Sequence, residues 1–190
     1  PVELPVRAFG PRSAWVRWLG AHHASSPGIW VELAKKGSAK KSISHLEAVE
    51  VALCFGWIDG QGKGQDETTW LQKFTPRRAK SIWSKINRDR ALALIESGEM
   101  RPSGLLEVER AKKDGRWQAA YDSPSRATVP ADLAQALGKN ARARKFFAEI
   151  DARNRYAILF RIHNAKKPET RARRIADFVA MLARRETLHR

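Results

Sequence analysis

The sequence has little cysteine and no long apolar run, and both shortages limit what the protein can be. Its 190 residues include one cysteine, Cys54, which excludes an internal disulfide and a multi-cysteine metal site. The longest purely apolar stretches span a few residues, such as 51–55, whereas a membrane helix needs about 20. Arginines interrupt the first 20 residues, so no secretory signal is expected. We therefore predict a cytoplasmic protein without a membrane span.

The spacing of the histidines and glycines also excludes a zinc site and the common nucleotide-binding loops. His22 and His23 are adjacent and the other three histidines are scattered, so the sequence has no pair of ligands at zinc spacing. The glycine-rich segment 60–64 has the wrong spacing for a phosphate-binding or dinucleotide-binding loop. The sequence predicts no metal and no cofactor.

Positive charge is abundant and unevenly distributed. The chain has 36 basic and 20 acidic residues, a net charge of +16. Residues 1–124 carry a net +6 and all seven tryptophans, whereas residues 125–190 carry a net +10. The change in composition coincides with a turn-like Ser-Pro-Ser segment at 123–125. We predict a Trp-rich domain over 1–124 and a basic domain over 125–190.

Local patterns predict a predominantly α-helical α+β fold. A capping box at Ser44 and Glu47 begins one helix, and residues 29–33 form a short strand. Two apolar runs around the glycine-rich segment indicate an antiparallel hairpin, and Thr75-Pro76 indicates a helix start. Residues 125–190 contain apolar stripes at helical spacing. We expect helices around a small antiparallel β element, followed by a C-terminal helical bundle.

The segment 56–87 contains a candidate anion site. Arg77 and Arg78 lie in the first turn of the expected helix, where only an anion would favour both guanidinium groups beside free N–H groups. Asp59 follows a strand and is a candidate acid or base, a turn former, or an ion-pair partner for one arginine. The structural alternative places Trp83 in the core and makes Asn87 a helix cap. The predicted site, for an anionic small molecule or acidic protein partner, comprises Trp57, Asp59, Arg77, Arg78, Ser81, Trp83 and Asn87.

Two alternative functions follow from the same residues and from a second basic cluster. An enzyme would use Asp59 as acid or base and Arg77 to hold an anionic substrate. A nucleic-acid-binding protein would use the cluster before and within the last helix, although a charge run is usually a solvated face. This cluster comprises Lys166, Lys167, Arg171, Arg173 and Arg174.

Several motifs resemble a known bacterial family. They are the segments 52–60, 74–78, 81–87 and 115–117, with Tyr121 and the segment 165–175, and they are similar to the YdeI/OmpD-associated, or bacteriocin-protection, family. The resemblance implies that residues 125–190 form an OmdA-type module. It also implies a stress-tolerance role against bacteriocins or cationic antimicrobial peptides, and association with an outer-membrane porin, but no known reaction. Members often have an Arg-Tyr pair where this chain has Thr69-Trp70.

Overall fold

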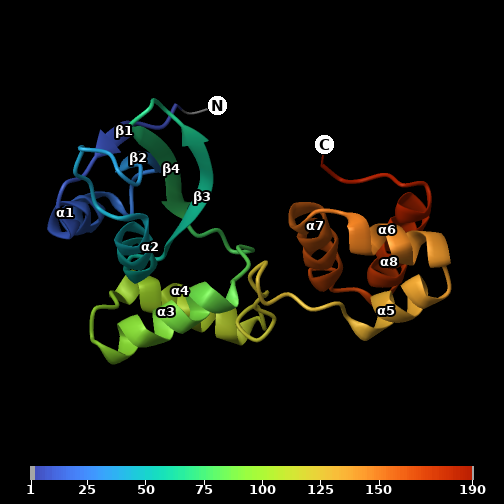
Figure 1. The fold of residues 1–190 in the computed structure, drawn as a ribbon. Helices are drawn as coiled ribbons and strands as arrows, with labels where there is room; N and C mark the ends of the chain where they lie inside the picture. The colour runs from blue at the N-terminus through green and yellow to red at the C-terminus, as the bar shows by residue number, and fades with distance from the viewer. Residues whose placement is uncertain (1–2, 190) are drawn as a thin grey trace. The chain divides into compact units, whose positions relative to one another are not determined.

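The computed structural model describes residues 3–189 and divides the chain into two compact units, residues 1–120 and 121–190. Within the described residues, the first unit contains a sheet and helices, and the second contains helices alone (Figure 1). The α+β class and the predominance of helix, both predicted from the sequence, are confirmed.

The N-terminal unit contains a four-stranded mixed sheet. Its strands are β1 (Val6–Ala8), β2 (Ile29–Ala34), β3 (Trp57–Gly64) and β4 (Thr69–Pro76), in the order β1-β2-β4-β3. The predicted β2 strand and β3–β4 hairpin are both present, and β4 pairs antiparallel with each of its neighbours. The sequence does not predict β1, which is three residues long and pairs parallel with β2. This short strand is the reason that the sheet is mixed instead of purely antiparallel.

Four helices complete the described part of this unit: α1 (Arg12–His22), α2 (His45–Cys54), α3 (Lys85–Glu96) and α4 (Pro102–Lys113). The predicted capping box at the start of α2 is formed. Ser44 Oγ accepts from Glu47 N at 3.2 Å, and the Glu47 carboxylate accepts from Ser44 N at 3.0 Å. The Ser44 hydroxyl also donates to the Glu47 carboxylate at 2.6 Å, and this bond together with the one from Ser44 N lowers the pKa of Glu47. Gly56 follows α2 with φ of 75°, a conformation that glycine adopts without strain.

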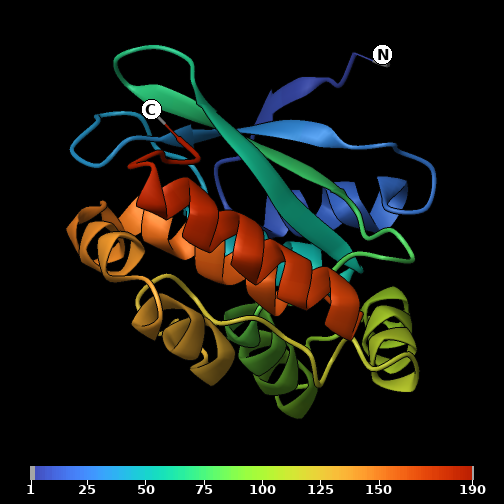
Figure 2. The same cartoon turned by 90° about the vertical axis from the view of Figure 1, so that its right-hand side faces the viewer.

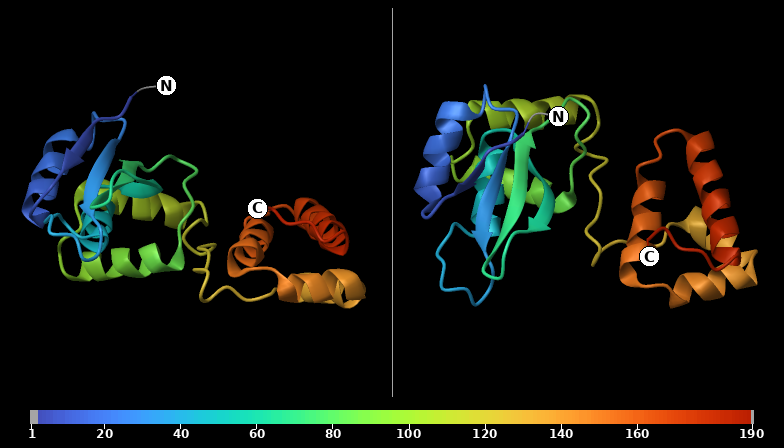
Figure 3. Two further views of the ribbon diagram at one scale, coloured as in Figure 1. Left: turned by 45° about the horizontal axis from the view of Figure 1, so that its top comes forward. Right: turned by 90° about the horizontal axis from the view of Figure 1, so that it is seen from above.

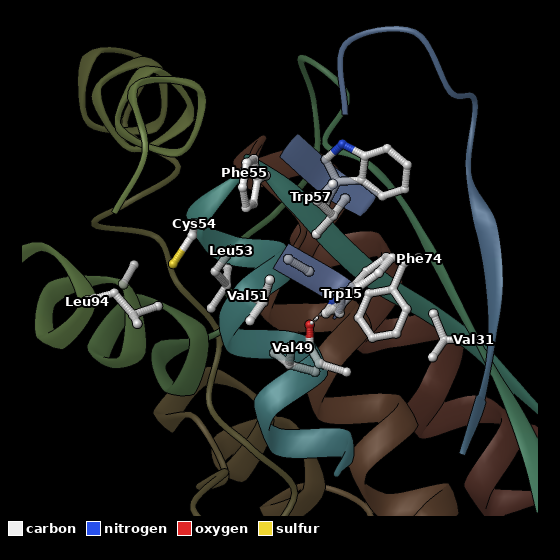
Figure 4. Packing of buried hydrophobic residues seen from close by; sticks show 14 of the residues in the cluster. Trp15, Val31, Val49, Val51, Leu53, Cys54, Phe55, Trp57, Phe74 and Leu94 are labelled. Carbon is white, nitrogen blue, oxygen red and sulfur yellow. Dashed lines mark hydrogen bonds between the residues drawn. The ribbon is translucent and has the colours of Figure 1, made fainter. Parts of the chain in front are cut away.

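Alternate residues of the sheet face a core made with α1 and α2. Ile29, Val31 and Leu33 are buried, as the period of two in a strand requires. Figure 4 shows Trp15, Val31, Val49 and Phe74 gathered in this core. Trp15 Nε1 donates to the Ala48 carbonyl at 3.1 Å, so this buried ring keeps its polar atom satisfied.

The prediction of a helix immediately after Thr75-Pro76 is wrong. Strand β4 extends to Pro76, residues 77–84 are mostly irregular, and α3 begins at Lys85. Ser84 caps α3, because its Oγ accepts from Asn87 N at 3.1 Å. The cap is therefore Ser84, and Asn87 lies inside the helix. The upstream segment instead buries Trp83, which is 2% exposed.

The C-terminal unit is helical throughout its described elements, as predicted. These are α5 (Ala131–Gly138), α6 (Ala141–Glu149), α7 (Ala152–His163) and α8 (Pro168–Ala183). Helix α8 packs against the other three, and Figures 2 and 3 show it beside α6 and α7. The apolar stripes of the sequence meet in one core, whose fully covered members include Leu133, Ile162 and Leu182.

Candidate functional site

Arg77 and Trp83 meet, and both are buried. Arg77 follows β4, and its backbone N–H donates to the Gly56 carbonyl at 3.0 Å. Its guanidinium carbon lies 3.6 Å from the centre of the Trp83 ring, and Nη1 donates to the Ile82 carbonyl at 3.3 Å. The two residues are 7% and 2% exposed. This geometry is a cation–π contact in which both side chains help to pack the segment after β4.

The other members of the predicted anion site lie in different settings. Trp57 is 1% exposed and donates its ring N–H to the His23 carbonyl at 3.1 Å. Arg78 is exposed, and its backbone N–H donates to Ser81 Oγ at 2.9 Å. Asn87 Oδ1 accepts from Arg90 at 3.1 Å. None of Arg77, Arg78 and Ser81 lies on a helix, so the helix N-terminus that motivated the anion site is absent there. The site itself stays a prediction.

Asp59 lies at ion-pairing distance from a histidine, and the two carry opposite charges only when the imidazole is protonated. It lies on β3 opposite Phe74, and its Oδ2 is 4.0 Å from His45 Nε2. The carboxylate and imidazole side chains are 30% and 46% exposed, so solvent screens the pair. A carboxylate and an imidazole can exchange a proton when they reach hydrogen-bonding distance. Asp59 as a catalytic acid or base stays a prediction.

Cys54 and the titratable clusters offer little for covalent or metal chemistry. Cys54 is 4% exposed, and burial raises the pKa of its thiol to about 11. The thiolate that would act as a nucleophile is therefore scarce at neutral pH. Among residues 3–189, no three His, Cys, Asp or Glu side chains are grouped to hold a metal ion. None of the described helices combines the length and apolar character needed to span a membrane.

The basic cluster at the start of α8 divides into two kinds of residue. Arg171 donates from Nε and Nη2 to the Asp132 carboxylate at 2.6 and 2.9 Å, and from Nη1 to the Ile162 carbonyl at 3.0 Å. Arg174 Nη1 donates to the Arg161 carbonyl. These two arginines connect α8 to α5 and α7. The remaining members, Lys166, Lys167 and Arg173, are exposed.

The sequence reasoning missed a second group of cations at the start of α6. Lys139, Arg142, Arg144 and Lys145 are all exposed, and Asn140 caps this helix by accepting from Ala143 N at 3.0 Å. The sequence does indicate this group, because residues 139–145 contain four cations and no acidic residue. With these, residues 121–190 carry 16 basic and 7 acidic residues, a net charge of +9. The unit attracts anions over its surface.

Two family models match the chain, one for each unit. Residues 7–107 match a family described as "Domain of unknown function (DUF8412)". Residues 126–185 match the OmdA family, described as "Bacteriocin-protection, YdeI or OmpD-Associated", which confirms the resemblance for this segment. No curated protein and no solved structure matches the chain.

Proposed function

Because the chain belongs to the DUF8412 family and carries an OmdA bacteriocin-protection domain, we propose that it is a non-catalytic stress-tolerance factor that binds a polyanionic partner. It acts in the cytoplasm. The C-terminal unit supplies the binding surface. The observation that supports this proposal most directly is a set of exposed cations in that unit for which residues 3–189 supply no acidic partner.

Three of these cations lie at the start of α8. Lys166, Lys167 and Arg173 are exposed, and no acidic side chain of the described residues forms an ion pair with them. By contrast, the nearby Arg171 is neutralised by Asp132. An exposed cation without an internal partner keeps its full charge for an external phosphate or carboxylate. The cations on α6 add to the same attraction.

The net charge also argues against the simplest mechanism of tolerance. A protein of net charge +16 repels a cationic peptide at long range, so direct capture of such a peptide is disfavoured. Tolerance would therefore arise through an acidic partner inside the cell.

The test is the salt dependence of binding to a short fluorescent single-stranded oligonucleotide, with polyglutamate as a second polyanion. The variant Lys166→Glu/Lys167→Glu/Arg173→Glu removes the three exposed cations. The matched control, Lys36→Glu/Lys41→Glu/Lys113→Glu, makes the same charge change at exposed positions of the N-terminal unit.

We expect the affinity of the unmodified chain to fall steeply between about 50 and 200 mM salt. The first variant should lower the slope of log K against log salt by about 2, since each contact with a single strand contributes about 0.7. The control variant should change this slope much less. Equal losses in both variants would show that only net charge matters. No binding to either polyanion at low salt would refute the proposal.

A further inference from the structure

The C-terminal unit contains a cavity of about 140 Å³ between the segment 121–130, α7 and the start of α8. We propose that this cavity binds one pyrimidine base of a single-stranded nucleic acid whose phosphates contact the neighbouring cations. The inference rests on the proposed function and names the polyanion. Residues from three parts of the unit carry it: Tyr121, Thr128, Tyr156, Phe160, His163 and Arg171.

The volume selects a single ring. A closed apolar cavity of about 150 Å³ accommodates benzene, so the volume of this partly open and more polar cavity is sufficient for one six-membered ring. A pyrimidine has one such ring, whereas a purine has a fused second ring. The size therefore favours uracil, thymine or cytosine over adenine or guanine.

The walls suit a flat aromatic ligand. The Tyr121 and Phe160 rings are 4.9 Å apart at an interplanar angle of 86°, and the Tyr156 and Phe160 rings are 5.9 Å apart. Leu159, which is 7% exposed, also lines the cavity. Bases of single strands stack on the faces of aromatic side chains, and three such side chains line this cavity.

A hydrogen bond holds the wall in place before any ligand arrives. Tyr156 donates its hydroxyl hydrogen to the Asp122 carbonyl at 3.0 Å, which fastens the segment at 121–122 to α7. Burial raises the pKa of Tyr156, so the hydroxyl remains a donor at neutral pH. A preformed cavity spares the ordering cost that binding would otherwise include.

The polar groups at the cavity suit the edge of a base better than a free anion. Arg171 uses three of its five N–H donors within the described residues, which leaves two, and it is oriented by Asp132. The Thr128 hydroxyl can donate or accept. Asp122 also lines the cavity, and its charge disfavours a bare carboxylate or phosphate there. A pyrimidine edge offers both acceptors and donors to such a mixed set.

The cations that would hold the phosphates lie next to the cavity along the chain. Lys166 and Lys167 stand between two lining residues, His163 and Arg171. Arg171 N donates to the Lys167 carbonyl at 3.0 Å, so these two residues are one helical turn apart. An aromatic pocket beside exposed cations is the arrangement that binds single strands.

The experiment compares fluorescent oligo(U), oligo(A) and an abasic strand of equal length by anisotropy. Thr128→Trp should fill the mouth of the cavity from an exposed position, so folding is expected to survive. Val129→Trp is the matched control, since Val129 is exposed and does not line the cavity. Free uridine followed by NMR at Thr128 and Tyr156 tests the cavity without phosphates.

We expect oligo(U) to bind about tenfold tighter than oligo(A) or the abasic strand, the scale of one stacked base. Thr128→Trp should abolish the preference and Val129→Trp should keep it, and uridine should shift the cavity resonances. Equal, salt-dependent affinities for all three strands would overturn the base site and leave polyanion binding intact. The base site would also be overturned if Thr128→Trp kept the preference for oligo(U). The same holds if uridine left the resonances of Thr128 and Tyr156 unshifted.

Discussion

Arg171 and Asp132 form a two-point ion pair at the start of α8. Two N–H groups of the guanidinium face the two carboxylate oxygens at 2.6 and 2.9 Å. This hydrogen bonding holds the pKa of Asp132 below its ordinary value of 3.8 and raises that of Arg171. The side chains are 29% and 44% exposed, so water weakens the attraction but leaves the fork geometry. The ion pair therefore fixes the side chain of Arg171, which lines the cavity of the C-terminal unit.

Asp132→Asn should therefore destabilise the C-terminal unit in a pH-dependent way. At neutral pH we expect a loss of about 0.5–1 kcal/mol, the scale of a partly exposed pair. Because the folded state lowers the pKa of Asp132, the stabilisation is complete above the unfolded value of 3.8 and disappears as pH falls through the lower folded value. The measurement is thermal unfolding of both proteins from pH 7 to pH 3.

The control for this prediction is Glu186→Gln in the same unit. Glu186 pairs with Arg184 at 2.9 Å, but both side chains are more than half exposed. This substitution should hardly change stability at either pH. A gap between wild type and Asp132→Asn that stays constant down to pH 3 would contradict the assignment.

At the scale of elements, the start of α3 depends on one serine. Ser84 Oγ accepts the N–H of Asn87 at 3.1 Å, and the Asn87 side chain accepts from Arg90 instead of capping a helix. Ser84→Ala should cost about 1 kcal/mol of unfolding free energy, whereas Asn87→Ala should cost only a few tenths. Chemical denaturation followed by tryptophan fluorescence measures both. Comparable losses, or a larger loss for Asn87→Ala, would restore Asn87 as the cap.

The same segment explains which elements the sequence could predict. Helices with a local signature, such as the capping box at Ser44 and the apolar stripes of the last unit, were confirmed because their signals lie within one or two turns. The segment after Pro76 was predicted wrongly, because its conformation depends on burying Trp83 against Trp117, 34 residues away. Strand β1 was missed because its pairing with β2 is a long-range contact.

The candidate site was harder to predict than the fold. Arg77 and Trp83 are close in sequence and do meet, but burial depends on the tertiary packing that the motif does not contain. The cavity unites residues between 121 and 171. Tyr121 and Arg171 lie in segments that resemble the family, but no local pattern shows that the two meet at one cavity. The charge of the C-terminal unit was visible from composition, yet the neutralisation of Arg171 by Asp132 was not. The sequence predicted the basic cluster, and packing showed which of its members are exposed and which are paired within the unit.

At the scale of the whole molecule, each unit has a hydrophobic core of its own. The described core of the first unit runs from Phe9 to Ala120, and that of the second from Leu133 to Leu182. All seven tryptophans belong to the first unit, so tryptophan fluorescence reports on that unit alone. Separate cores lead us to expect two unfolding transitions.

A glycine in the first unit allows the transitions to be moved separately. A Cβ at Gly104 would lie 2.7 Å from the Leu53 carbonyl oxygen, so Gly104→Ala must push α4 away from the end of α2. We expect a loss of about 1–3 kcal/mol, seen as a lower midpoint by tryptophan fluorescence. Gly20→Ala is the control within α1, where a Cβ meets nothing within 4 Å, and it should be neutral or stabilising.

The unfolding transition of the C-terminal unit should respond to Asp132→Asn instead. Far-ultraviolet circular dichroism follows the helices of both units, and Asp132→Asn should lower only the transition that tryptophan fluorescence does not detect. Gly104→Ala should lower only the transition that tryptophan fluorescence detects. If either variant shifted the fluorescence and circular dichroism signals equally, the two cores would unfold as one cooperative unit instead of two.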